Sequence, residues 1–315
     1  MSGRLVWTGK LLIVALMLAA SRPSWASDAA YPGYALHDTQ VRVIHSDRVG
    51  IDYKLYIGLP RGYEAKSESY PVVMVLDADY CFAMMHGIIG LLADHDELAP
   101  VILVGIAYPG VAEQKQGPIY KRSRTRDYTP SHVENDGFGY GEEFQKVSGG
   151  GDHFLDFIAQ ELTPYLEREF RVRPQDRTIV GYSFGGLFAS YALLTRPGLF
   201  QRYLIVSPSL WWDRHLIPRL EKEKAPFLKD IPARAFFSVG EPEDHDQMPM
   251  VQDLVNFINA LKSRRYSGLR TDLWVAPDET HHSVFPGAAM RGIKWIFAAD
   301  SESQTAAKGE SPSRR

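Results

Sequence analysis

The stretch that decides the fold is TIVGYSFGGL, residues 178–187, in which an apolar run ends at a serine and small residues follow at once. Gly181 and Gly185 stand two positions before and two positions after Ser183. In a strained turn from strand to helix, side chains at those two positions would clash with the backbone, so small residues such as glycine are needed there. The pattern predicts a nucleophile elbow, with the N–H of Phe184 at a helix start where an oxyanion would form. The alternative is a glycine-rich turn that merely contains a serine.

Length and composition limit the class of protein. The chain has 315 residues with 45% hydrophobic and 23% charged residues, which is enough to build a single α/β domain with a large core. Its formal charge of −3 would become −6 without residues 1–26, because three basic and no acidic residues would leave. We therefore expect no nucleic-acid partner. Cys81 is the single cysteine, so no internal disulfide is possible.

The two ends of the chain differ from its middle. Arg4 and Lys10 precede an apolar run at 11–20, and SWA at 24–26 offers small residues where a signal peptidase cuts. That run is shorter than the roughly 20 residues of a membrane-spanning helix. We expect a signal peptide at 1–26, a periplasmic or secreted location with no membrane attachment, and a catalytic domain at 27–300. Residues 301–315 contain almost nothing apolar and predict a disordered tail.

The middle of the chain alternates between strand and helix patterns. Alternating polar and apolar residues at 41–45 and 51–58 predict an antiparallel hairpin at a sheet edge. Apolar runs typical of buried strands lie at 72–76, 101–107, 178–182, 202–206, 233–239 and 271–275. Helical spacing covers 81–92, 154–170, 187–194, 251–261 and 288–297. This order predicts an α/β-hydrolase fold, a doubly wound and mostly parallel sheet with an N-terminal antiparallel hairpin.

Residues 108–151 interrupt this rhythm, because no periodic element is visible over a span much longer than most connections. The segment is rich in aromatic residues, which argues for a loop folded over a site. They are Tyr120, Tyr128, Phe138, Tyr140 and Phe144.

Four cations, Lys121, Arg122, Arg124 and Arg126, lie within six residues of this segment. They are either a solvated basic turn or a patch beside Tyr120 and Tyr128 that attracts an anionic, aromatic substrate. Trp211 and Trp212, which follow the strand at 202–206, belong either to the same wall or to the core.

The catalytic partners of an elbow serine follow it in the order acid, then histidine. The strand at 233–239 ends in GEPED at 240–244. Glu243 is the preferred acid, because a carboxylate three residues after Gly240 has completed the turn and can point back towards the serine. Asp244 and Glu241 remain alternatives, as does a solvated acidic loop. After the last strand, PDETHHSV at 277–284 offers His281 and His282, of which His281 is preferred as the base.

A second oxyanion donor should come from the backbone after the strand at 72–76, from Asp79 or Tyr80. Asp77 and Asp79 lack the spacing of a calcium loop, so we expect no metal and no cofactor.

Several motifs together resemble one known family. They are LDADYCF at 76–82, RTRDYTP at 124–130, GYSFGGLFA at 181–189, SPSLWW at 207–212, GEPED at 240–244 and ETHHSVFP at 279–286. They are similar to the serine esterase family of α/β-hydrolase fold that includes the esterases of catechol siderophore trilactones such as enterobactin, salmochelin and bacillibactin. The resemblance implies Ser183 as nucleophile and His281 as base. His282 stands where the family has a small residue, and Ala78 where it has glycine. Some members are described as Ser-His dyads, without the acid.

The resemblance implies a carboxylic-ester hydrolase that forms an acyl-enzyme and acts on a small-molecule ester. Together with the signal peptide expected at 1–26, this predicts an exported enzyme, which we expect to be a monomer. A siderophore trilactone such as ferric enterobactin is the sharpest substrate hypothesis. A generic acyl or feruloyl esterase is the alternative within the class. An acyltransferase of mycolyltransferase type and a hydrolase fold retained only for binding are the competing functions.

Overall fold

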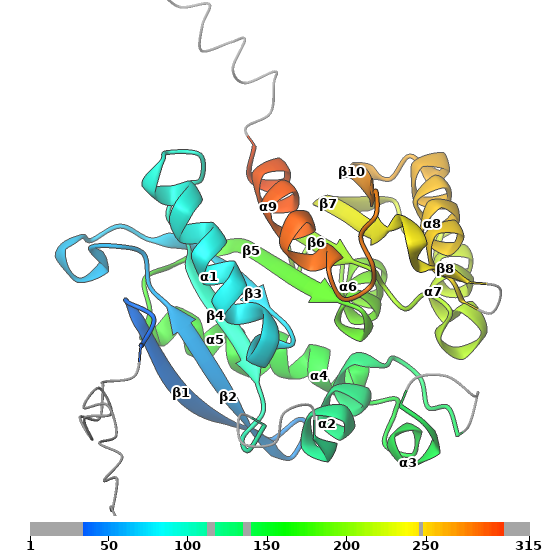
Figure 1. Ribbon diagram of the computed structural model, residues 1–315, viewed down its shortest axis with the longest axis horizontal. Helices are drawn as coiled ribbons and strands as arrows, with labels where there is room; N and C mark the ends of the chain where they lie inside the picture. The colour runs from blue at the N-terminus through cyan, green and yellow to red at the C-terminus, as the bar shows by residue number, and fades with distance from the viewer. Residues whose placement is uncertain (1–33, 112–116, 135–139, 246–247, 299–315) are drawn as a thin grey trace, which may run out of the picture. The chain divides into compact units, whose positions relative to one another are not determined.

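An eight-stranded sheet forms the centre of the computed structural model, which describes residues 34–111, 117–134, 140–245 and 248–298 (Figure 1). Its strands are β1 (Thr39–Ser46), β2 (Ile51–Gly58), β3 (Tyr70–Val75), β4 (Ile102–Ala107), β5 (Val172–Tyr182), β6 (Arg202–Val206), β7 (Asp230–Gly240) and β10 (Ser267–Ala276). They lie in the order β1-β2-β4-β3-β5-β6-β7-β10. The pairs β1–β2 and β2–β4 are antiparallel, and every other neighbouring pair is parallel. The expected N-terminal hairpin and mostly parallel sheet are therefore confirmed.

The inner strands are apolar along their length because both faces of the sheet are covered. In β6, Tyr203 and Ile205 belong to one hydrophobic cluster, while Leu204 and Val206 belong to the cluster on the opposite face. Side chains alternate across a strand, so a strand buried on both sides needs an unbroken apolar run. That requirement explains why the strand runs were recognisable in the sequence.

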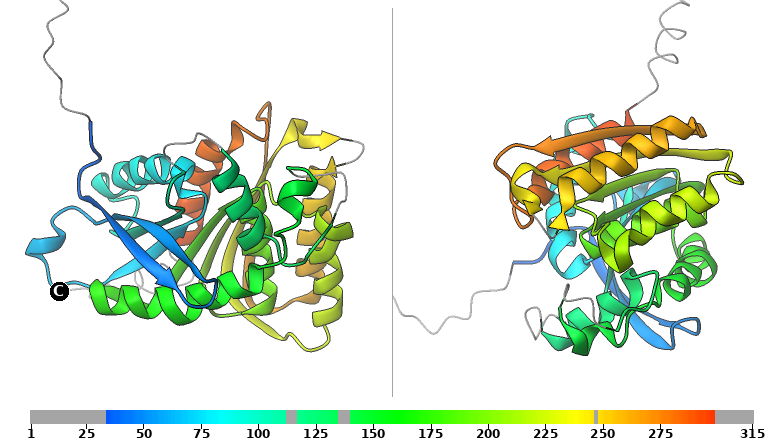
Figure 2. Two further views of the ribbon diagram at one scale, coloured as in Figure 1. Left: turned by 90° about the horizontal axis from the view of Figure 1, so that it is seen from below. Right: turned by 90° about the vertical axis from the view of Figure 1, so that its right-hand side faces the viewer.

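Helices cover both faces. They are α1 (Ala78–Asp94), α2 (Pro118–Tyr128), α3 (Glu142–Gln145), α4 (Gly151–Phe157), α5 (Thr163–Glu169), α6 (Phe184–Thr195), α7 (Trp212–Lys224), α8 (Met250–Arg264) and α9 (Val284–Phe297). Helices α1 and α9 pack on one face, and α4 to α8 pack on the other, as the two views of Figure 2 show. Shorter elements are η1 (Tyr63–Ala65), η2 (Ile158–Leu162), η3 (Glu241–Glu243), β8 (Asp244–His245) and β9 (Met248–Pro249).

Three helical regions differ from the sequence prediction. The segment 108–151 is not free of regular structure, because it contains α2 and α3. The predicted helix at 154–170 is divided by the π-helical turn η2 into α4 and α5. Helix α7 was not predicted, since it carries Pro218 and many charges and begins with a distorted turn. Asp213, Arg214 and His215 there have φ values of 47°, 53° and 62°.

The described residues from Leu36 onward form one compact unit. The predicted signal peptide at 1–26, the predicted tail at 301–315 and Phe138 lie outside the described residues. Within the described part of the chain, none of the helices combines the length and the apolar character needed to cross a bilayer.

Candidate active site

Ser183 lies at the junction between β5 and α6, with φ 60° and ψ −118°. A non-glycine residue in that conformation is strained, and the surrounding structure must hold it. A Cβ built on Gly181 would lie only 2.1 Å from the carbonyl oxygen of Gly185, so this glycine is a strict requirement. A Cβ on Gly185 would lie 3.3 Å from a carboxylate oxygen of Asp77, which is a milder conflict. The strand-to-helix elbow expected around Ser183 is thus present in the backbone.

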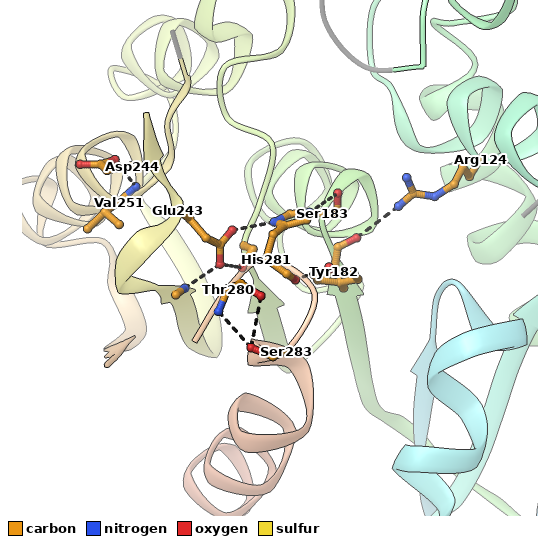
Figure 3. A network of polar contacts seen from close by, with 11 residues as sticks. Arg124, Tyr182, Ser183, Glu243, Asp244, Val251, Thr280, His281 and Ser283 are labelled. Atoms are coloured by element: carbon orange, nitrogen blue, oxygen red, sulfur yellow. Dashed lines mark hydrogen bonds and ion pairs between the residues drawn. The ribbon is translucent and has the colours of Figure 1, made fainter. Parts of the chain in front are cut away.

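The side chains of Ser183, His281 and Glu243 form a hydrogen-bonded series, as Figure 3 shows. The Nε2 atom of His281 lies 3.1 Å from Oγ of Ser183, and its Nδ1 atom lies 2.6 Å from Oε2 of Glu243. A carboxylate accepts hydrogen bonds, so the imidazole proton belongs on Nδ1 and Nε2 is left to accept from the serine hydroxyl. The side chain of Glu243 is 3% exposed and that of His281 is 33% exposed, so the base, unlike the acid, opens to solvent.

The orientation of Glu243 is determined by two further donors. Its Oε1 atom accepts hydrogen bonds from the Ser207 hydroxyl at 2.7 Å and from the N–H of Gly240 at 2.6 Å. Because both donors bind the same oxygen, Oε2 is left for His281. Sequence reasoning missed Ser207, although it begins the motif SPSLWW. In the structure it follows β6 directly and has a positive φ of 41°.

The alternative acid and base residues have other surroundings. Asp244 accepts hydrogen bonds from the N–H groups of Val251 at 2.8 Å and Gln252 at 3.3 Å, and therefore caps the start of α8. Glu241 is exposed. His282 is exposed as well, and its ring centroid lies 5.6 Å from that of His281. His282 lines the cavity over Ser183, but it is His281 that hydrogen-bonds to the serine hydroxyl and Glu243 that binds the histidine.

Of the expected oxyanion donors, Phe184 lies at the cavity, whereas Asp79 and Tyr80 do not line it. Phe184 is the first residue of α6 and lines the cavity beside the serine. Neither Asp79 nor Tyr80 is among the described residues that line this cavity. The N–H of Tyr80 already donates to the carbonyl of Asp77 at 2.9 Å, so it is committed to the first turn of α1.

The three arginines of α2 do not form one patch. Arg124 is buried, and its Nε and Nη2 atoms donate to the two carboxylate oxygens of Asp77, each at 2.9 Å. Burial opposes its charge, but the nearby Asp77 carboxylate raises the pKa of Arg124, so it stays protonated. Arg124 also lines the cavity over Ser183. Arg126 pairs with Asp127 at 2.6 Å and lines a different hollow beside β1 and β2, whereas Arg122 is exposed.

A cavity of about 520 Å³ opens over the serine, and the surface that it exposes is mainly apolar. Trp211 belongs to its wall, whereas Trp212 is fully buried and donates from Nε1 to the Ser131 hydroxyl at 3.1 Å. Tyr128, also expected at the site, is fully buried and absent from this lining. Tyr140, from the aromatic segment that was expected to fold over a site, lines the cavity. Sequence reasoning missed other lining residues, which come from distant segments: Ser209, Met248, Met250 and Thr280.

No group of three or more His, Cys, Asp or Glu side chains that could hold a metal ion occurs among the described residues. The groups that meet at this site are a hydroxyl, an imidazole and a carboxylate in hydrogen-bonded series. Such a series can activate the hydroxyl for attack on a carbonyl group.

Comparisons with known proteins point to the same chemistry. Ferri-bacillibactin esterase BesA of Bacillus subtilis is 27% identical, and the match covers 85% of this chain and 92% of BesA. Apo-salmochelin esterase of Escherichia coli is 28% identical over 50% of this chain and 47% of its own length. The crystal structure of an IroE-like serine hydrolase from Shewanella oneidensis is 29% identical with a TM-score of 0.74, over 86% of this chain and 85% of the other.

The expected α/β-hydrolase architecture is confirmed by the likeness to that hydrolase, and the chain is an ester-hydrolysing serine hydrolase. The profile of the family described as "Putative esterase" matches residues 46–250, which is more than half of the sequence. The resemblance first seen in the motifs is thereby confirmed, and the chain belongs to the "Putative esterase" family.

Proposed function

We propose that this chain hydrolyses the ester bonds of a siderophore, with Ser183 as nucleophile, His281 as general base and Glu243 as the acid that orients the base. The observation that carries the proposal is the position of His281, whose two ring nitrogens lie 3.1 Å from the serine hydroxyl and 2.6 Å from the carboxylate. The names of its relatives, esterases of bacillibactin and salmochelin, support the choice of substrate class.

In this mechanism His281 takes the proton of the Ser183 hydroxyl as its oxygen attacks the ester carbonyl. The N–H of Phe184 donates to the oxyanion that forms. The imidazolium, stabilised by Glu243, then protonates the leaving alcohol, and an acyl group remains on Ser183. Water, deprotonated by the same imidazole, releases the acid and restores the serine.

The cavity supports a bulky substrate with aromatic parts. Its volume of about 520 Å³ lies within the range of small-molecule sites, and its wall includes Tyr140, Phe184 and Trp211. Aromatic rings offer stacking surfaces for the catechol groups of a trilactone. We also propose that residues 1–26 are a signal peptide and that the mature chain, beginning at Ser27, acts in the periplasm or outside the cell.

The Ser183→Ala variant tests the mechanism. It should lower kcat for p-nitrophenyl butyrate and for enterobactin, apo and ferric, by about 10⁴-fold or more. Its melting temperature should stay close to that of the wild type, because the hydroxyl is a reacting group rather than a packing group. Products are identified by mass, with and without an added alcohol, so that hydrolysis is distinguished from acyl transfer.

The matched control is Ser263→Ala, which removes an exposed serine hydroxyl on α8 and should leave turnover unchanged. Activity of Ser183→Ala within tenfold of the wild type would exclude the serine mechanism. Turnover of p-nitrophenyl butyrate without turnover of either form of enterobactin would leave an esterase with a different substrate.

A further inference from the structure

Tyr182, the residue before the serine, points away from the cavity. Val180 and Tyr182 pack on the face of the sheet covered by α1 and α9, whereas Ile179 packs on the opposite face. This alternation is the ordinary one for a strand such as β5. It places the Tyr182 ring next to the segment between β10 and α9, residues 277–283, which carries His281.

The contacts of Tyr182 hold both the main chain and the ring of the histidine. Its hydroxyl donates a hydrogen bond to the carbonyl oxygen of His281, and the two ring centroids lie 5.0 Å apart (Figure 3). The same ring lies 5.8 Å from that of Phe285 at the start of α9. Tyr182 therefore joins the elbow strand to the histidine segment at a point one residue away from the nucleophile.

The topology explains why such a link is needed. Strands β6 and β7 separate β5 from β10 in the sheet, so the histidine segment starts three strand spacings from the serine. At about 4.8 Å per spacing, this is roughly 14 Å. The segment must return over that distance and place Nε2 within hydrogen-bond reach of the hydroxyl. A displacement of about 1 Å at a reacting group can cost about a hundredfold in rate.

We propose that Tyr182 is a positioning residue for the base: its hydroxyl fixes the His281 carbonyl, and its ring supports the imidazole between Ser183 and Glu243. This inference rests on the proposed role of His281. Tyr182 is not among the described residues that line the cavity, so it acts through His281 and not by contact with the substrate.

The hydroxyl is suited to this role at neutral pH. Burial raises the pKa of Tyr182, and the nearby Glu243 carboxylate adds to the rise. The phenol therefore stays protonated and remains a donor over the range in which an imidazole titrates.

The Tyr182→Phe variant keeps the ring and removes the donor. It should lower kcat for p-nitrophenyl butyrate about tenfold and leave KM within about twofold, since the base is misplaced while the cavity is intact. Labelling of Ser183 by a fluorophosphonate should slow by the same factor, because it needs the same base. The low-field proton NMR signal of the His281 Nδ1–H should also shift or broaden. If the Tyr182 hydroxyl had only a structural role, its removal would leave both the labelling rate of Ser183 and this NMR signal unchanged.

Tyr191→Phe is the matched control, because it removes a phenol hydrogen bond from α6 to Asp152 on α4, away from the histidine. It should leave kcat unchanged. Tyr182→Leu, which removes the ring as well, should lose more kcat than Tyr182→Phe.

An unchanged kcat in Tyr182→Phe overturns the inference. So does a loss that appears only in KM, or a lower melting temperature with normal kcat in the folded enzyme. The proposed function is tested separately by Ser183→Ala. Activity retained in Ser183→Ala contradicts the proposed function, whereas an unchanged kcat in Tyr182→Phe contradicts only the role of Tyr182.

Discussion

Glu243 shows how far a single residue can be placed from sequence. Its choice over Glu241 rested on the geometry of a turn that brings a carboxylate back three residues after Gly240, with Asp244 kept as the alternative. In the structure the N–H of Gly240 donates to Glu243, which is the local bond that turns the side chain back. The contribution of Ser207 was not predictable, because that hydroxyl comes from a different strand, 36 residues away.

Replacing Glu243 and Asp244 one at a time by the corresponding amide should show which carboxylate is the catalytic acid and which one caps helix α8. Glu243→Gln should lower kcat about 10- to 10³-fold, because a neutral amide cannot stabilise the imidazolium. Asp244→Asn should leave kcat within about twofold, since asparagine caps the helix as well as aspartate does. Steady-state kinetics with p-nitrophenyl butyrate measure both. A larger loss for Asp244→Asn would move the acid by one residue.

Helix α2 shows why an element can be absent from a sequence prediction. Its buried side chains include Ser123, Arg124, Thr125 and Asp127, so the buried face carries no apolar periodicity. Polar groups are buried there because each charge has a partner: Arg124 binds Asp77, and Arg126 binds Asp127. Asp77 lies 47 residues from Arg124, and the burial of Asp127 beside Arg126 could not be seen in the sequence, so the arginines were interpreted as a basic turn or patch.

The elbow, by contrast, is determined by backbone crowding within five consecutive residues and was predictable.

Arg124→Gln should destabilise the fold, because Arg124 is paired with Asp77 even though it also lines the cavity. It leaves the Asp77 carboxylate buried without its cation, which costs about 3–5 kcal/mol of the free energy of unfolding. The double variant Asp77→Asn with Arg124→Gln should recover part of that loss. Exposed Arg122→Gln should change stability by less than about 0.5 kcal/mol. Urea unfolding measures all three.

The same variants report on the substrate. Since Arg124 supports the site structurally, kcat/KM should fall alike for ferric enterobactin and p-nitrophenyl butyrate in Arg124→Gln. A loss confined to ferric enterobactin would show that Arg124 recruits the anion, as the patch hypothesis requires.

At the scale of the whole molecule, the catalytic order follows from the sheet. Ser183, Glu243 and His281 follow β5, β7 and β10, whose carboxyl ends lie at one edge of the sheet because the strands are parallel. The sequence showed the strands and their order, and in this fold the acid and then the histidine follow the serine along the chain. The cavity was less predictable, because its wall brings together side chains from positions as distant as Tyr140 and Met248. Contacts between such distant residues depend on the conformations of loops, whose sequences carry no periodic pattern.

The net charge of the molecule leads to a prediction about salt. The chain carries a formal charge of −3, and two of the three arginines of α2 are neutralised by buried carboxylates. A polyanion such as ferric enterobactin therefore meets a molecule whose overall field repels it. Because salt screens exposed charges beyond a Debye length of roughly 8 Å at physiological ionic strength, added salt should leave kcat/KM for this substrate unchanged or raise it.

The measurement compares ferric enterobactin with neutral p-nitrophenyl butyrate at low and high salt. The neutral ester serves as control, because its capture carries no charge and its kcat/KM should stay constant within about twofold. A tenfold fall for the ferric substrate alone would mean that cations attract it after all. Lys121 and the exposed Arg122 would then be the residues to neutralise, since Arg124 and Arg126 are already held in ion pairs.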